Sequence, residues 1–139
     1  MNLGFCPECY AVQIVDKINP DTMFKKGYFY FSSSIGTLRE HFRKYAAEVV
    51  DRFVLNREST TILEFGCNDG VLLSPLADLN IGTLIGVDPA SNVVNKIDDE
   101  RIVAINSYFD EKCADKVVDE FGYVDLILAN NVFAHVNDI

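Results

Sequence analysis

From residue 61 onward, short apolar runs alternate with helix-like segments, and this alternation restricts the fold more than any other feature of the chain. The runs are brief, rich in β-branched residues and bounded by Gly, Asp or Asn, as buried parallel strands are. We expect strands over four ranges: 60–65, 83–87, 102–105 and 124–129. Crossover helices fit the segments between them: 72–79, 92–97 and 111–121. Strands joined by helices predict an α/β fold with a doubly wound parallel sheet.

The sequence continues for only a few residues after the fourth expected strand. A doubly wound nucleotide-binding fold usually carries further strands beyond its switch point. We therefore expect half a sheet with an uncovered edge, in a fragment of a longer polypeptide. The hydrophobic period changes near residue 60, and we divide the chain into two parts: an N-terminal arm over 1–35, and the N-terminal half of a ligand-binding domain over 36–139.

The first 34 residues read as a small irregular segment that cannot hold a core of its own. After them, Thr37-Leu38-Arg39-Glu40 has the spacing of a capping box. Apolar residues then recur at helical intervals, which predicts an amphipathic helix over 37–55. Its expected apolar face consists of Leu38, Phe42, Tyr45, Ala46, Val49 and Phe53.

Charge and composition exclude some partners. The 139 residues include 12 Lys plus Arg against 21 Asp plus Glu, a formal net charge of −9, so we expect no nucleic-acid partner. No apolar stretch is long enough for a membrane span, and no signal-peptide pattern begins the sequence. The four cysteines are scattered apart from one pair, which suits a reducing compartment without disulfides. These features predict a cytoplasmic protein, and they say nothing of its oligomeric state.

The strongest chemical signal is the turn Glu64-Phe65-Gly66-Cys67-Asn68-Asp69-Gly70, between an expected strand and an expected helix. Its glycines allow a tight turn, and the following helix start presents free N–H groups to a ligand. The negative charge of Glu64 would repel a pyrophosphate, but it can help bind a cationic group. Asp88 ends the next strand, where an acidic side chain can accept both ribose hydroxyls. Together they favour an adenosyl ligand without a diphosphate; the alternative is a plain turn, with Asp88 as a helix cap.

Five strings in the chain resemble one family: LEFGCNDGVLL at 63–73, GVDPA at 86–90, NNVFAHV at 130–136, CPECYAVQ at 6–13 and YFYFSS at 28–33. The family is that of S-adenosylmethionine-dependent C-methyltransferases acting on nucleotide-linked keto-deoxysugars. The resemblance implies a Rossmann-like class I methyltransferase fold with an N-terminal zinc-binding segment. It also implies S-adenosylmethionine as cofactor and a nucleotide-sugar as small-molecule substrate.

The resemblance further implies roles for particular residues. Four residues of the turn would line the methionine and ribose end of the cofactor: Glu64, Gly66, Asn68 and Gly70. Asp88 would bind the ribose hydroxyls, and Pro89 would shape the turn beside the adenosine. Phe109 would offer a ring face to the adenine, with core packing as the equal alternative. Asn130 and Asn131 leave the fourth strand at its carboxyl end, where one of them would touch the cofactor.

Catalytic roles are implied for Tyr28, Tyr30 and His135. A tyrosine hydroxyl beside a developing enolate oxygen would donate a hydrogen bond where charge accumulates, although both tyrosines could simply anchor the arm. His135 would contact substrate or cofactor near the transferred methyl, or else cap a helix or lie on the surface. His41 is expected to be a partly buried structural residue. The family's general base comes from beyond this segment, so we expect the 139 residues alone to be inactive.

Cys6 and Cys9 have the spacing of half a zinc site, which needs four ligands. Family members supply the other two from an upstream Cys-x-x-Cys, so zinc is expected only where that pair is present. A thioredoxin-like redox role requires the motif to open a helix after a strand, and 12–15 does not read that way. Cys67 and Cys113 are unpaired and are not assigned to the metal.

Three functions remain open from the sequence. The favoured one is a fragment of a sugar C-methyltransferase. The second is a methyltransferase-like fragment for another small acceptor, since the turn and Asp88 report on the cofactor alone. The third is a non-catalytic zinc-ribbon and α/β binding module.

Overall fold

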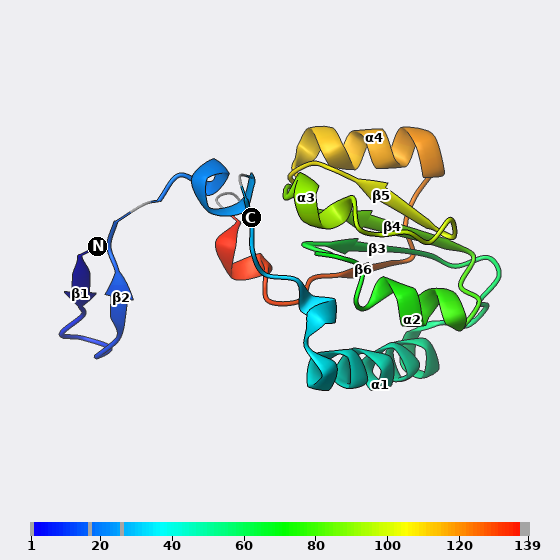
Figure 1. The fold of residues 1–139 in the computed structure, drawn as a ribbon, viewed down its shortest axis with the longest axis horizontal. Coiled ribbons are helices and arrows are strands. Elements are labelled where there is room, and N and C mark those ends of the chain that lie inside the picture. The colour runs from blue at the N-terminus through cyan, green and yellow to red at the C-terminus, as the bar shows by residue number, and fades with distance from the viewer. Residues whose placement is uncertain (1, 17, 26, 137–139) are drawn as a thin grey trace.

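A four-stranded parallel sheet forms the centre of the molecule (Figure 1). The computed structural model describes residues 2–16, 18–25 and 27–136; positions 1 and 139, which end the two predicted domains, lie outside these ranges. The strands are β3 (Thr61–Phe65), β4 (Thr83–Val87), β5 (Ile102–Ile105) and β6 (Leu126–Leu128). Their order across the sheet is β5-β4-β3-β6. The direction of winding therefore reverses beside β3, which confirms the predicted doubly wound α/β fold.

Helices cover both faces of this sheet. In Figure 1, α1 (Gly36–Phe53) and α2 (Leu73–Asp78) lie on one side, and α4 (Glu111–Phe121) lies on the other. The short helix α3 (Ser91–Val94) follows β4. These elements match the predicted ones, apart from ends that differ by a few residues. None of the helices in the described ranges is long and apolar enough to cross a membrane.

The alternation of side chains along a strand explains why the sheet needs both layers. On β3, Ile62 packs with the cluster that α1 and α2 complete, whereas Leu63 packs with Cys113 and Val117 of α4. Ile62 and Leu63 are both buried. Successive strand residues point to opposite faces, so a continuous apolar run is stable only when both faces are covered.

Helix α1 begins differently from the prediction. Its N-cap is Ile35, and no side chain caps it; Thr37 lies inside the first turn, so the predicted capping box is wrong. The chain enters the helix from a 3-10 turn at Ser32–Ser34, and this turn decides where the first helical residue falls. The face toward the sheet carries Phe42, Ala46, Val49 and Val50.

Two further expectations for α1 are wrong. Phe53, placed on the apolar face, is 62% exposed at the last position of the helix. His41, expected to be partly buried, is exposed, because it lies on the outer surface, where its ring stacks on Tyr45 with centroids 6.2 Å apart.

The N-terminal part is more regular than the sequence suggested. Strands β1 (Leu3–Phe5) and β2 (Val12–Ile14) pair antiparallel, with Leu3 opposite Ile14. A π-helical turn follows at Asp21–Lys25. The hairpin lies apart from the main sheet in Figure 1, and its side chains Leu3 and Val12 are 73% and 66% exposed. As expected, this segment has no core of its own.

Candidate functional site

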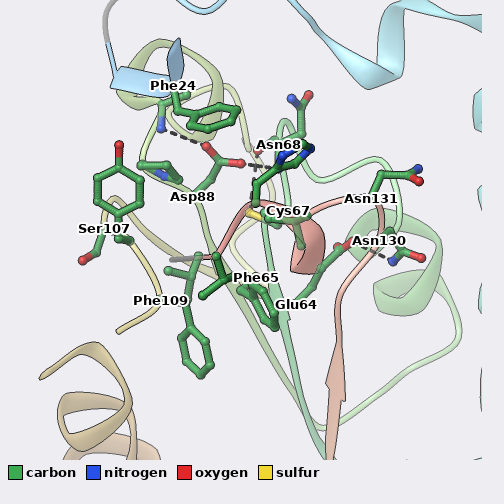
Figure 2. Close-up of a pocket in the computed structure, with 18 of the residues that line it drawn as sticks. Phe24, Glu64, Phe65, Cys67, Asn68, Asp88, Ser107, Phe109, Asn130 and Asn131 are labelled. Atoms are coloured by element: carbon green, nitrogen blue, oxygen red, sulfur yellow. Dashed lines mark hydrogen bonds between the residues drawn. The ribbon is translucent and has the colours of Figure 1, made fainter. Parts of the chain in front are cut away.

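A pocket of about 860 Å³ opens at the carboxyl ends of the parallel strands. Each strand contributes the residues that follow it, and the N-terminal arm supplies another wall. Such a position, beside the reversal in strand order, is where open α/β sheets bind ligands. Figure 2 shows side chains from these separate segments turned toward one another. Eleven of the predicted site residues line the pocket: Tyr28, Tyr30, Glu64, Gly66, Asn68, Asp88, Pro89, Phe109, Asn130, Asn131 and His135.

Glu64 is the most unusual of these residues. It is 2% exposed, and its Oε1 accepts a hydrogen bond of 3.2 Å from Asn130 Nδ2 (Figure 2). Its Oε2 has no hydrogen-bond partner among the described residues. Burial raises the pKa of Glu64 to about 8, with a smaller contribution from the charge of Asp88, and the bond from Asn130 opposes the rise. A buried polar atom without a partner is costly in a folded protein, so this oxygen is suited to a ligand that donates to it.

Gly66 lets the chain turn sharply after β3. Its φ is +68°, and a Cβ built there would lie 2.7 Å from Val132 Cγ2. No side chain fits at this position. The Gly66 and Cys67 N–H groups donate to the Val87 carbonyl at 2.8 and 3.3 Å, which ties the turn to β4. Gly70, predicted to face the cofactor, does not line the pocket; it lies against Ile97 at the start of the helical segment.

Asn68 has a left-handed backbone, with φ of +53°. Its N–H donates to Asp88 Oδ2 at 3.0 Å, while its side chain turns to the arm. Oδ1 accepts from the Ser32 N–H, and Nδ2 donates to the Tyr30 carbonyl, both at 2.9 Å. Asn68 therefore lines the pocket but uses both polar atoms of its amide on the chain itself.

Asp88 is buried at the end of β4. Its Oδ1 accepts from the Ala90 N–H at 2.8 Å, and its Oδ2 accepts from Asn68. Burial raises the pKa of Asp88, and these two bonds partly offset the rise. The bond from Ala90, two residues further on, closes a turn before α3. The N-cap of α3 is Ala90 itself and no side chain caps this helix, so the alternative interpretation of Asp88 as a helix cap is wrong. Each carboxylate oxygen still has a second lone pair for a ligand.

Aromatic side chains from three segments form the outer wall. The ring centroid of Phe24 lies 6.0 Å from that of Tyr28 and 6.0 Å from that of His135. Burial, followed by the charges of Asp88 and Tyr30, raises the pKa of Tyr28. Phe24 was not predicted, because nothing local in the sequence shows that the π-helical turn reaches the pocket.

Phe109 packs in the core and also lines the pocket, and its stacking on adenine stays a prediction. Its ring stacks on Phe65, with centroids 5.1 Å apart and an interplanar angle of 16°. It thus packs with the core cluster on the α4 side and also lines the pocket. Nearby, Tyr108 donates to Asp21 Oδ1 at 3.0 Å, which attaches the π-helical turn to the loop after β5.

Cys6 and Cys9 lie in the hairpin turn between β1 and β2, away from the pocket. Hydrogen bonds from the backbone of Cys9 and Glu8 lower the pKa of Cys6. Within the described ranges, no three His, Cys, Asp or Glu side chains gather where they could hold a metal ion. The pair alone therefore does not fit a four-ligand zinc site. The motif opens no helix, so the structure gives the redox alternative no support.

The contact between Asp69 and Ser33 was also missed. Ser33 donates to Asp69 from its N–H at 3.1 Å and from its Oγ at 2.6 Å. These partners are 36 residues apart in sequence, and no short-range pattern could have paired them.

Comparisons with known proteins agree with this architecture. Residues 38–139 match a family described as a methyltransferase domain. The C-methyltransferase NovU of Streptomyces niveus is 28% identical over 139 residues, which cover 100% of this chain and 32% of NovU. The chain thus spans about a third of the length of this curated relative.

Solved structures of two methyltransferases are also similar. The magnesium protoporphyrin IX methyltransferase of Synechocystis PCC 6803, solved with bound SAH, is 16% identical, with 67% of this chain and 35% of that chain covered and a TM-score of 0.37. The CcbJ methyltransferase of Streptomyces caelestis is 17% identical, with 59% and 35% covered and a TM-score of 0.40.

Proposed function

The chain belongs to the methyltransferase domain family, and we propose that its pocket binds S-adenosylmethionine as the methyl donor. The observation that carries this proposal is Glu64, a buried carboxyl beside the pocket whose Oε2 lacks a partner among the described residues. The ammonium of the donor's methionine part is a cation with several N–H groups to give. It can reach this oxygen directly or through a water molecule.

The rest of the proposed cofactor site follows the strand ends. Asp88 has lone pairs left for the ribose hydroxyls, and Pro89 and Phe109 line the side where the adenosine would lie. Asn130 donates a hydrogen bond of 3.2 Å to Glu64. The next residue, Asn131, also lines the pocket. Gly66 has no Cβ, which lets Val132 pack against the turn that lines the pocket.

Bound there, the donor supplies an electrophilic methyl group on its sulfonium. The chain contributes placement of that methyl and removal of water, since the apolar and aromatic lining surrounds the site. We propose C-methylation of a nucleotide-linked keto-deoxysugar as the reaction. The supports are the C-methyltransferase relative at 28% identity and the five strings that resemble the sugar-methylating family.

In this proposal, Tyr28 and Tyr30 provide hydrogen-bond donors for the enolate oxygen, and His135 contacts the acceptor near the methyl. All three line the pocket. We assign the general base to none of the described residues. Cys6 and Cys9 would supply two zinc ligands, with the other two from an upstream pair, and the cytoplasm is the proposed location.

Binding of S-adenosylhomocysteine, measured by calorimetry on the full chain, tests the cofactor proposal. We expect Asp88→Ala to weaken binding by roughly tenfold or more, because a hydrogen bond to a charged group contributes about 1.5–3 kcal/mol. Asp119→Ala removes the same charge from the exposed surface of α4 and should bind like the wild type. A folded wild-type protein that does not bind the ligand would favour the non-catalytic module.

The acceptor is tested separately. Incubation of the complete polypeptide that contains this chain with labelled donor and either keto-sugar nucleotides or other small acceptors should label the sugar carbon. Labelling of another acceptor class in place of the sugar would retain the cofactor site and overturn the sugar assignment.

A further inference from the structure

The N-terminal arm is fastened to the turn after β3 by side chains that belong to that turn. Asn68 binds the arm backbone at Tyr30 and Ser32, each at 2.9 Å. Asp69 binds the next residue, Ser33, through its N–H at 3.1 and 3.2 Å and through its Oγ at 2.6 Å. Successive arm residues are thus held by successive turn residues.

Two further contacts extend the attachment. Asn92 Nδ2, from α3, donates to the Tyr28 carbonyl at 2.8 Å. Arg39 Nη1, from the first turns of α1, donates to the Ser33 carbonyl at 2.6 Å. The arm backbone is therefore fixed at Tyr28, at Tyr30 and at the serines after them, and the side chains of both tyrosines form a wall of the pocket.

Asp69 differs from Asn68 in one respect. It is half-buried, yet it does not line the pocket. Its hydrogen bonds to the arm go to Ser33, and, in addition to burial, its charge raises the pKa of Asp88. A bound molecule in the pocket would contact the arm tyrosines and not this carboxylate, so any placement of those tyrosines by Asp69 has to pass through Ser33.

We propose that Asp69 is a positioning residue: with Asn68 it holds arm residues 28–34 as a wall of the pocket and thereby places Tyr28 and Tyr30 against the acceptor. The catalytic part of this inference rests on the proposed function. The structural part concerns the chain alone and can be tested without any ligand.

Hydrogen exchange of the arm is the first test, on the full chain without ligand. Asp69→Ala should speed exchange of the Ser33 N–H by about tenfold, because a hydrogen bond to a charged group that protected it is lost. Asp69→Asn keeps an acceptor oxygen and should restore most of the protection. Asp119→Ala, the charge-matched control on α4, should leave the arm unchanged. Equal exchange in Asp69→Ala and this control would overturn the proposal.

A variant on the arm side guards against a general loss of structure. Ser33→Ala removes the hydroxyl that donates to Asp69 and keeps the backbone N–H. If the two groups act as one contact, combining Ser33→Ala with Asp69→Ala should speed exchange at Ser32 by less than the product of their single effects. If the double variant speeds exchange by the full product of the two single effects, Ser33 and Asp69 do not act as one contact.

Kinetics then test the positioning role in the complete polypeptide that contains this chain and its general base, with a nucleotide-linked keto-deoxysugar as acceptor. Asp69→Ala should lower kcat/KM for the acceptor by about tenfold, since misplaced catalytic groups lose much of their effect. Affinity for S-adenosylhomocysteine should stay within about threefold of the wild type. An equal loss of both would make Asp69 part of the cofactor site and overturn the inference. If the wild type binds no S-adenosylhomocysteine, the proposed function fails, while the exchange result still decides the attachment of the arm.

Discussion

At the scale of single residues, the environment of Glu64 carries the most chemistry. The sequence placed an acidic side chain at the end of β3, but it could not show how completely the surrounding helices and strands bury it. Burial raises the pKa of Glu64 to about 8, so without a ligand the carboxyl is mostly neutral at pH 7, and a bound ammonium would favour its ionised form. A residue that reads as a fixed charge in the sequence is a titrating group in the fold.

The unfolding free energy should depend on pH through Glu64. Its pKa is higher in the folded than in the unfolded chain, so the folded state binds the proton more tightly, and stability falls as pH rises from about 4.5 to about 8. In Glu64→Gln we expect the unfolding free energy to fall less over this pH range, by on the order of 3 kcal/mol. Urea denaturation of the wild type and of Glu64→Gln at pH 5 and pH 8 measures this difference. If the unfolding free energy falls equally between the two pH values in both proteins, the pKa of Glu64 is not raised.

Gly66 should tolerate no side chain. Gly66→Ala combines a left-handed φ of +68° with a Cβ 2.7 Å from Val132 Cγ2, and we expect a loss of roughly 3 kcal/mol in unfolding free energy. Gly27→Ala is the matched control: its φ is +65°, but its Cβ would meet Phe29 at an ordinary 3.6 Å. That variant should lose about 1 kcal/mol. Equal losses by chemical denaturation would mean that the clash with Val132 is relieved by movement.

At the scale of elements, the sequence predicted what depends on local period and missed what depends on distant partners. The four strands and the helices between them follow from alternating apolar runs, and the structure confirms them. The hairpin β1-β2 and the arm contacts of Asn68 and Asp69 were not predicted, because their partners are not adjacent in sequence. The N-cap of α1 was misplaced for a related reason: the 3-10 turn before it sets the start.

Helix capping offers a contrast between two helices. Asp110 is the N-cap of α4, and its Oδ1 accepts from the Cys113 N–H at 3.0 Å. Asp110→Ala should therefore reduce the unfolding free energy by about 1 kcal/mol. Thr37→Ala in α1 should change it by less than about 0.5 kcal/mol, because Thr37 is not a cap there. Denaturation of both variants checks this, and a larger effect at Thr37 would restore the capping box.

At the scale of the whole molecule, the main sheet and the N-terminal hairpin contribute unequally to stability. The fold was predicted from the strand pattern and is confirmed. Of the family that the five strings resemble, membership of the methyltransferase domain family is confirmed. The sugar acceptor, the zinc and the roles of individual site residues stay predictions. The hairpin carries the paired cysteines but buries little apolar surface, because Phe5 and Ile14 are 61% and 51% exposed.

Removal of residues 2–15 should leave the main sheet intact. Burial of apolar surface provides most of the stability of a domain, and the hairpin contributes little of it. We expect Tm to change by less than about 3 °C. Differential scanning calorimetry of the shortened and full chains makes the comparison. A decrease in Tm well above this value would mean that the hairpin packs on the sheet in solution.

The order of the strands also has a consequence for how the molecule folds. β3, β4 and β5 are consecutive in the chain and adjacent in the sheet, whereas Asp125, just before β6, bonds to Thr61 across 64 residues. Closing that loop carries a larger entropic cost than pairing the earlier strands. β6 is therefore expected to join last, and it brings Asn130 and His135 with it. We therefore expect this side of the pocket to form late, when β6 brings Asn130 to Glu64 Oε1.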